Sequence, residues 1–306
     1  MVKIIIVTGF LGSGKTTFLK QMLNNCDEQV GILINEIGKI GLDDKLLTNS
    51  VLGSSDTLLL SGGCVCCNKL DEIKKALSKL INANEKLRYI IIETTGVANI
   101  APIVFTILSD IFLSNHFKIH KIITCIDALN YQSHIKNEEA INQITSANEI
   151  IVTKTDLNEN FDKKIISNIN KSAFIYTKEE YSKKLFFDKN NSIPFTSSQP
   201  SHQNNIININ FEFKTTLNWE KFCIWLSLLL HKHGTNILRI KGILDVGESE
   251  CVSINGVYHH IYPSEHISIT PKQSTLILIF KNIDKNKIIN SFAGFLNLKE
   301  NDFIVS

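Results

Sequence analysis

Apolar and polar residues follow a regular alternation along the first 180 residues of the chain. Runs of mainly β-branched residues predict strands, and segments with apolar residues at helical spacing predict helices between them. The run at 89–93 is apolar on both faces, which is typical of a central strand in a parallel sheet. The predicted strands span residues 3–7, 29–34, 57–60, 89–93, 121–126 and 149–153. This alternation predicts an α/β fold with a mainly parallel sheet covered by helices on both faces.

The pattern changes after residue 188. Residues 189–205 are polar, contain Pro194 and Pro200 and have no apolar period, so we expect a linker there. Beyond it, the pattern predicts strands over 206–213, 237–246, 251–261 and 275–280, and helices over 219–231 and 285–295. The prediction is therefore a first domain at 1–188 and a smaller C-terminal α+β domain at 206–306.

The composition is that of an ordinary globular protein, with 43% hydrophobic and 20% charged residues. A net charge of +2, with only Arg88 and Arg239 as arginines, gives no general electrostatic case for binding nucleic acid or a membrane. The N-terminal apolar run is too short for a signal sequence, and no apolar run reaches the ~18 residues of a spanning helix. Seven cysteines, an odd number, argue for reduced thiols. We expect a cytoplasmic protein.

A glycine-rich stretch follows the first predicted strand. Its spacing G-x₄-G-K-T is that of a phosphate-binding loop, in which backbone N–H groups and the lysine hold phosphates and the hydroxyl holds Mg²⁺. A chance glycine-rich turn is the alternative. The strand before it and the predicted helix after it favour the loop, because a helix N-terminus attracts anions. The residues expected to bind nucleotide here are Gly9, Gly12, Ser13, Gly14, Lys15, Thr16 and Thr17.

The strand at 89–93 ends in an acidic residue followed by Thr-Thr-Gly. We expect Glu93 to hold a Mg²⁺-bound water or to orient the attacking water, and the Gly96 N–H to contact a γ-phosphate. An ordinary transition from strand to loop is the alternative interpretation. The phosphate loop upstream favours the functional one.

Another tetrapeptide, Thr153-Lys154-Thr155-Asp156, closes the strand at 149–153. The Asp156 carboxylate matches the N1–H and amino protons of guanine, a donor pair that adenine does not offer, so this segment predicts selection of GTP. Thr153 stands where the familiar form has asparagine. A charged turn at a helix entry explains the tetrapeptide equally well, but its place one strand–helix unit after the strand at 121–126 favours base binding.

Three cysteines crowd into Cys64-Val65-Cys66-Cys67, just before a predicted amphipathic helix at 70–82. Helical N–H groups and Lys69 stabilise thiolates there. Two or three thiolates suit Zn²⁺, with Co²⁺ or Cu⁺ as further candidates. Such a set leaves the ligand shell of the ion incomplete, so one position stays available for ligand exchange. Buried structural cysteines and a redox pair are the alternatives.

The segments GFLGSGKT, NEIG, GGCVCC, ETTGVAN and TKTD, in this order, resemble the CobW family of P-loop GTPases, relatives of the nickel chaperones for urease and hydrogenase. Residues 238–244 and 257–260 resemble the second domain of that family. The resemblance therefore covers nearly the whole chain, and its most specific element is the cysteine triplet.

The resemblance implies a GTP-dependent metallochaperone that hydrolyses GTP slowly and delivers a metal to a client metalloprotein. Cys64, Cys66 and Cys67 match its metal motif, and Glu36 of Asn-Glu-Ile-Gly matches a switch residue near Mg²⁺. Ile37 replaces the usual phenylalanine. His202 is the only histidine of the linker, where some members carry a histidine-rich tract, which argues against an auxiliary metal-loading role.

The expected cofactors are thus GTP, Mg²⁺ and Zn²⁺ or Co²⁺. Thr16 and Glu36 are the expected Mg²⁺ ligands, and the nucleotide-binding set also includes Gly96, Lys154 and Asp156. The catalytic residues implied are Lys15, Glu36 and Glu93. Nucleotide-dependent self-association is left open.

Two other functions stay open, a redox-sensing regulatory GTPase that uses the same cysteines and a P-loop small-molecule kinase. A kinase needs a basic lid over the transferred phosphate, for which two arginines offer little. His259 and His260 are consecutive on a predicted strand, so we expect them on opposite faces and unable to chelate one ion together.

Overall fold

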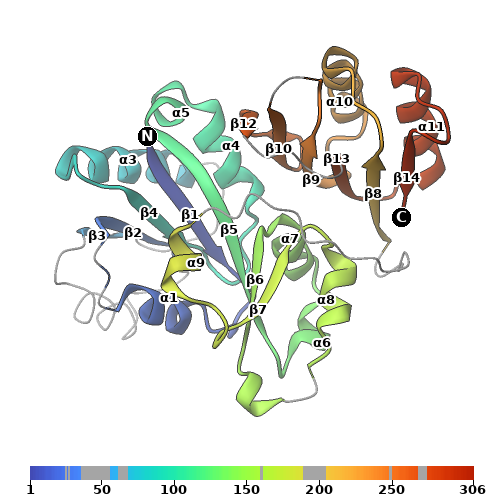
Figure 1. The fold of residues 1–306 in the computed structure, drawn as a ribbon. Coiled ribbons are helices and arrows are strands. Elements are labelled where there is room, and N and C mark those ends of the chain that lie inside the picture. The colour runs from blue at the N-terminus through green and yellow to red at the C-terminus, as the bar shows by residue number, and fades with distance from the viewer. Residues whose placement is uncertain are drawn as a thin grey trace. The chain divides into compact units, whose positions relative to one another are not determined.

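The computed structural model describes residues 1–24, 26, 28–35, 56–60, 68–158, 161–188, 205–247, 250–267 and 274–306. The chain divides into two compact units (Figure 1). The first unit comprises Met1–Asp162 and Phe174–Asn190, and the second comprises Lys163–Ala173 and Asn191–Ser306. The short segment Lys163–Ala173 therefore clusters with the C-terminal half of the chain. The domain boundaries expected at residues 188 and 205 stay predictions.

The first unit contains a seven-stranded sheet in which every neighbouring pair is parallel. Its strands, in the order β3-β2-β4-β1-β5-β6-β7, are β3 (Asp56–Leu60), β2 (Val30–Asn35), β4 (Tyr89–Glu93), β1 (Val2–Thr8), β5 (Phe117–Asp127), β6 (Glu149–Thr153) and β7 (Phe174–Thr177). Strand β4 is buried at all five positions, as a central parallel strand must be. The predicted parallel sheet is confirmed.

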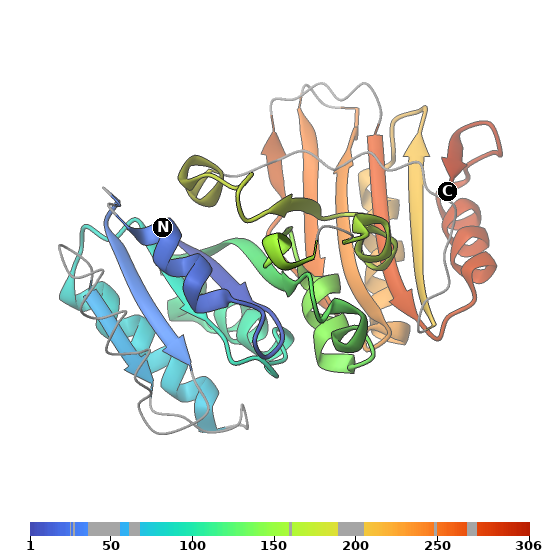
Figure 2. The ribbon, with the colours of Figure 1, turned by 90° about the horizontal axis from the view of Figure 1, so that it is seen from below.

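Helices cover both faces of this sheet (Figures 1 and 2). On one face, α1 (Lys15–Leu23) and α9 (Lys183–Phe187) bury Phe18, Met22 and Phe186 against alternate residues of the strands. The other face carries α3 (Asn68–Ala83), α4 (Ala101–Ser109), α5 (Ile111–His116) and α7 (Glu138–Ser146). The short helices α6 (Tyr131–His134) and α8 (Lys163–Ile169), and a 3₁₀ turn over Thr155–Leu157, complete residues 1–188. The prediction of helices on both faces is confirmed.

The second unit contains an antiparallel sheet with the order β11-β10-β9-β13-β8-β14, and a short strand β12 pairs with β10. Helices α10 and α11 close one face over an aromatic core that includes Phe211, Phe222 and Phe292. The elements are β8 (Ile206–Phe213), α10 (Trp219–His233), β9 (Ile237–Leu244), β10 (Cys251–Val257), β11 (His260–Ile261), β12 (Glu265–Ile267), β13 (Ser274–Lys281), α11 (Lys285–Leu296) and β14 (Phe303–Val305). The smaller α+β domain is confirmed.

The single strand predicted over 251–261 is wrong. Strand β10 ends at Val257, and Tyr258 adopts a left-handed φ of 56°, so the chain turns before β11. The centroids of the His259 and His260 rings lie 3.9 Å apart, which also overturns the expectation of opposite faces. Because a turn rather than a strand sets their directions, the two rings meet. Burial, and then the neighbouring His259, lower the pKa of His260 to about 4.

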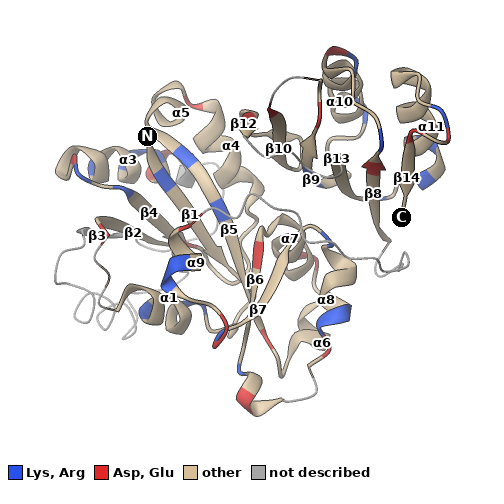
Figure 3. Ribbon diagram, in the orientation of Figure 1, with Lys and Arg blue, Asp and Glu red and all other residues tan. Residues whose placement is uncertain are grey.

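A buried ion pair joins strands β5 and β6. Lys121 Nζ lies 2.9 Å from Glu149 Oε1, and both side chains are only 3% exposed. Figure 3 shows a basic segment of β5 beside an acidic segment of β6. The Tyr181 hydroxyl donates to the same carboxylate, and Lys121 donates to the carbonyl oxygen of Leu185 at 2.7 Å. These bonds attach α9 to the sheet.

Substituting Lys121 with methionine is expected to lower the free energy of unfolding by about 3–5 kcal/mol, because the Glu149 carboxylate stays buried without its cation. The double variant Lys121→Met/Glu149→Leu should recover much of that loss. Denaturant unfolding of the full chain measures both effects. A matched control is Lys74→Met, whose partner Asp110 is partly exposed, and its cost should be at most about 1 kcal/mol. Equal effects of Lys121→Met and Lys74→Met would contradict the account.

Candidate functional site

The glycine-rich loop at residues 9–14 connects β1 directly to α1. Gly9, Gly12 and Gly14 have φ values of 143°, 72° and 80°, which L side chains rarely adopt. A Cβ atom on Gly9 would lie 2.3 Å from the carbonyl oxygen of Cys125 on β5. The glycines therefore let the backbone turn tightly against the neighbouring strand. The strand before the loop and the helix after it, both predicted, are present.

The first residues of α1 point back into this loop and across to β4. Lys15 Nζ donates to the carbonyl oxygens of Gly9 at 2.8 Å and Phe10 at 3.2 Å. Thr16 Oγ1 donates to Glu93 Oε1 at 2.7 Å, and Glu93 is 4% exposed at the end of β4. A hydroxyl and a carboxylate that meet beside a phosphate loop form an oxygen donor set of the kind that Mg²⁺ takes. Thr16 and Glu93 therefore fit that ion.

The segment after Glu93 packs directly on the loop. A Cβ atom on Gly96 would lie 2.6 Å from Leu11 Cδ2 and 2.7 Å from the Leu11 backbone nitrogen. Gln143 Nε2, on α7, donates to the carbonyl oxygens of Gly96 and Ala98, both at 3.1 Å. The backbone at Gly96 is thereby held between the phosphate loop and α7. Sequence reasoning missed Gln143, although a glutamine between Ile141 and Ile144 on an otherwise apolar helix face was a usable signal.

The tetrapeptide at the end of β6 reaches the same loop. Thr153 Oγ1 lies 2.9 Å from the carbonyl oxygen of Ser13 and 3.1 Å from that of Ile126. Thr153, which stands where the familiar form of this tetrapeptide has asparagine, thus links β5, β6 and the phosphate loop. Lys154 adopts a left-handed φ of 57°, and its Nζ lies 2.7 Å from Asp127 Oδ2. Asp156 is exposed in the following 3₁₀ turn.

All these residues lie at the carboxyl ends of parallel strands, which meet at one edge of the sheet, the usual place for a ligand in an open α/β fold. The structure brings together the expected residues of the phosphate loop, Glu93, Gly96 and the 153–156 segment. Glu36, Cys64, Cys66 and Cys67 lie outside the described residues. Among the residues that the structure does describe, no three His, Cys, Asp or Glu side chains are grouped to hold a metal ion.

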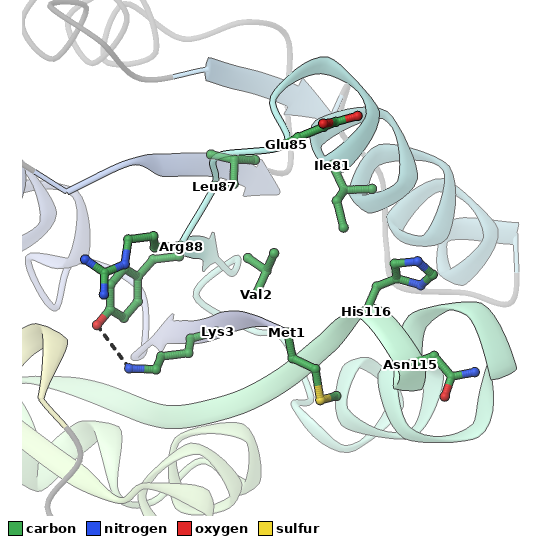
Figure 4. Close-up of a pocket in the computed structure, with 10 residues that line it drawn as sticks. Met1, Val2, Lys3, Ile81, Glu85, Leu87, Arg88, Asn115 and His116 are labelled. Carbon is green, nitrogen blue, oxygen red and sulfur yellow. Dashed lines mark hydrogen bonds between the residues drawn. The ribbon is translucent and has the colours of Figure 1, made fainter.

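A pocket of about 400 Å³ lies at the opposite edge of the sheet (Figure 4). Its lining includes Lys3, at the start of β1, Arg88, just before β4, and His116, at the end of α5. Lys3 Nζ donates to the Tyr89 hydroxyl at 3.3 Å. Because it lies at the amino ends of the strands, this pocket is separate from the phosphate loop.

None of the helices in the described part of the chain has both the length and the apolar character of a membrane span.

The parallel sheet, the glycine loop before α1 and the acidic end of β4 define a P-loop nucleotide-binding protein. Residues 3–176 match the family model "CobW/HypB/UreG, nucleotide-binding domain", and residues 206–296 match "Cobalamin synthesis protein cobW C-terminal domain". The chain belongs to the CobW/HypB/UreG family. The resemblance drawn from the sequence motifs is confirmed.

Two proteins similar in sequence to this chain, one from a bacterium and one from a yeast, have names that refer to zinc. The chain is 27% identical to the zinc chaperone YjiA of Escherichia coli over 316 residues, covering 96% of this chain and 98% of that protein. It is 38% identical to the zinc-regulated GTPase metalloprotein activator 1 of Schizosaccharomyces pombe over 162 residues. That match covers 51% of this chain but only 39% of the yeast protein, so the chain spans well under half of that relative.

A solved structure extends the likeness to the fold of the whole chain. The Zn(II)-bound YjiA GTPase from E. coli superimposes with a TM-score of 0.71 at 24% identity, covering 96% of this chain and 98% of that one. Both halves of the fold, the parallel sheet and the antiparallel C-terminal sheet, therefore belong to an architecture already seen in crystals.

Replacing Gly96 with alanine is expected to lower the turnover number for nucleotide hydrolysis at least about tenfold, because the new Cβ forces either the phosphate loop or the end of β4 to move. Steady-state phosphate release measures this. Gly294→Ala is the matched control, since a Cβ at that position on α11 meets nothing within 4 Å. Similar turnover numbers for the two variants would show that the close approach at Gly96 is unimportant.

Proposed function

We propose that this member of the CobW/HypB/UreG family is a GTP-hydrolysing metallochaperone that holds a transition metal, most simply Zn²⁺, on Cys64, Cys66 and Cys67 and delivers it to a client metalloprotein. The observation that carries the GTPase part is the hydrogen bond from Thr16 to Glu93 beside the glycine loop. Support for the metal part comes from the cysteine triplet and from the two relatives named for zinc.

The geometry at this edge of the sheet supports the proposed nucleotide-binding roles. Lys15 and the loop amides hold the β- and γ-phosphates, and Thr16 ligates Mg²⁺ together with Glu36. Glu93 is the proposed residue that orients a Mg²⁺-bound or attacking water, and its hydrogen bond from the Thr16 hydroxyl at 2.7 Å supports this role. The Gly96 N–H, on a backbone held against Leu11, is the proposed contact to the γ-phosphate.

The metal-binding role is argued from thiolate chemistry. Three thiolates and one exchangeable position suit Zn²⁺ and permit transfer, and Co²⁺ is the runner-up. Strand β3 ends at Leu60 and runs parallel to β2, and α3 begins at Asn68. Strand β3, which precedes the cysteines in sequence, therefore ends at the same edge of the sheet as the phosphate loop. We propose that loss of the γ-phosphate loosens the thiolate set.

A specific observation counts against the kinase alternative. The protein has two arginines, and neither serves as a lid over a transferred phosphate. Arg88 lines the pocket at the amino edge of the sheet, and Arg239 is fully buried on β9. Acceleration of hydrolysis by an arginine would then come from a partner.

Titration of Zn²⁺ into the reduced protein is expected to show one tightly bound ion per chain, with an affinity that differs between a non-hydrolysable GTP analogue and GDP by about tenfold or more. Metal binding should be lost in the Cys64→Ser/Cys66→Ser/Cys67→Ser variant. Cys223→Ser, at an exposed cysteine on α10, is the control that should bind Zn²⁺ normally. Stoichiometric Zn²⁺ binding by the triple variant would contradict the proposed metal site. Zn²⁺ affinity that is the same with the GTP analogue and with GDP would contradict the proposed coupling between nucleotide and metal.

A second test concerns the base. Asp156→Asn is expected to raise KM for GTP by about 10- to 100-fold, because two hydrogen bonds to a carboxylate are replaced by a mismatched amide. KM for xanthosine triphosphate should fall, since xanthine presents a carbonyl where guanine has its amino group. Steady-state hydrolysis with the two triphosphates measures the exchange in preference. An unchanged GTP preference in Asp156→Asn would remove Asp156 from the base site.

A further inference from the structure

Asp127 is a buried carboxylate that the proposed function does not use. It ends β5, is 1% exposed and accepts three hydrogen bonds. The Leu129 backbone N–H donates to Oδ1 at 2.8 Å, while Asn130 Nδ2 at 2.9 Å and Lys154 Nζ at 2.7 Å donate to Oδ2. From the sequence, this residue is indistinguishable from an ordinary turn cap. Its third donor, Lys154, lies 27 residues further along the chain, so Asp127 also joins two segments that are distant in sequence.

The bonds around Asp127 join two loops into one unit. The Ala128 backbone N–H donates to the carbonyl oxygen of Thr153 at 3.0 Å, and Asn158 Nδ2 donates to that of Ala128 at 2.7 Å. The turn after β5 and the 153–158 segment after β6 are therefore connected at three points, and the ion pair is the only one that uses a formal charge. The carboxylate thus sits at the centre of the structure that carries Lys154 and Asp156.

The conformation of Lys154 needs such a partner. Its φ of 57° is left-handed, which costs a residue with a Cβ atom backbone free energy unless surrounding contacts hold it. The preceding residue, Thr153, is bonded to the phosphate loop, and Asp156 follows two residues later. The lysine therefore occupies the bend between the residue that contacts the phosphate loop and the residue proposed to read the base.

The Asp127 carboxylate is ionised under neutral conditions. Burial acts to raise its pKa, but hydrogen bonds from Lys154, Asn130 and Leu129 outweigh burial, so the pKa is held below its usual value. The His134 ring lies nearby on α6, and burial lowers its pKa as well, although Asp127 acts in the opposite sense. The cation of Lys154 consequently faces a full negative charge.

We propose that Asp127 is a positioning residue for guanine recognition: its carboxylate clamps Lys154, which fixes the bend that presents Asp156 to the base. The inference rests on the proposed role of Asp156. Its consequence is that Asp127 acts on nucleotide affinity and base selectivity, whereas turnover of bound GTP depends on Lys15, Thr16 and Glu93. Because the base is the same in GTP and GDP, both nucleotides are affected alike.

The test measures binding of GDP and inosine diphosphate, which lacks the 2-amino group of guanine, by calorimetry with Mg²⁺ on the full chain. Asp127→Asn is expected to raise Kd for GDP about tenfold and to bring the ratio of the two Kd values close to one. The turnover number at saturating GTP should stay within about twofold of wild type. Lys154→Met, which keeps the aliphatic stem, should change the two Kd values in the same way, and the double variant should change them no more than either single variant does.

Asp110→Asn is the matched control. Like Asp127, Asp110 accepts a hydrogen bond from a backbone N–H, that of Leu113, and pairs with a lysine, Lys74. Unlike Asp127, it caps α5, and neither of these bonds reaches the 153–158 segment. Asp110→Asn should leave both Kd values unchanged. Wild-type selectivity retained in Asp127→Asn and Lys154→Met, or strictly additive effects in the double variant, would overturn the clamp while the role of Asp156 stands. If wild type does not distinguish GDP from inosine diphosphate, the proposed guanine site fails first, and the clamp with it. If Asp127→Asn does not fold, the ratio of the Kd values of Lys154→Met for GDP and inosine diphosphate tests the clamp instead.

Discussion

The close backbone packing around the loop between β1 and α1 is the constraint on which the rest of the site depends. Gly9 lies against the carbonyl oxygen of Cys125, Gly96 lies against Leu11, and Gly14 lies against Thr153. The loop is therefore enclosed by β5, β6 and the end of β4, and it cannot shift without moving a neighbour. In a packed interior a small displacement is transmitted rather than absorbed. This is the physical basis for expecting that the state of a bound phosphate changes the positions of Glu93 and of the 153–156 segment.

Among the described residues of the first unit, three buried carboxylates each accept a hydrogen bond from another element. Glu93 accepts from Thr16 of α1, Asp127 accepts from Lys154 beyond β6, and Glu149 accepts from Lys121 of β5. Each carboxylate ties together segments far apart in sequence, and removing Lys154 or Lys121 would leave Asp127 or Glu149 buried without its cation. Two of the three lie at the nucleotide edge, so the same bonds that hold the fold there also orient the groups proposed to act on GTP.

The proposed metal site at the cysteine triplet is supported by membership of the CobW/HypB/UreG family and by two relatives named for zinc. Thiolates bind borderline metals, and β3, the described strand that precedes the cysteines in sequence, ends at the same edge of the sheet as the phosphate loop. In the proposed function, GTP hydrolysis and metal binding use the same edge of one sheet.

The sequence alone determined the strand–helix alternation, the parallel sheet and the identity of the phosphate loop, because these depend on local periodicity and on glycine spacing. Its boundaries for β4 and β6 are those of the structure. Short edge strands such as β7, β12 and β14, and the turn between β10 and β11, escaped prediction, since pairing partners rather than periodicity define them. Only the tertiary structure decided that Thr153 is hydrogen-bonded to the phosphate loop, that Gln143 holds Gly96 and that Asp127 pairs with Lys154. Each of these contacts spans between 27 and 140 residues of chain, and local sequence carries no signal for such distances.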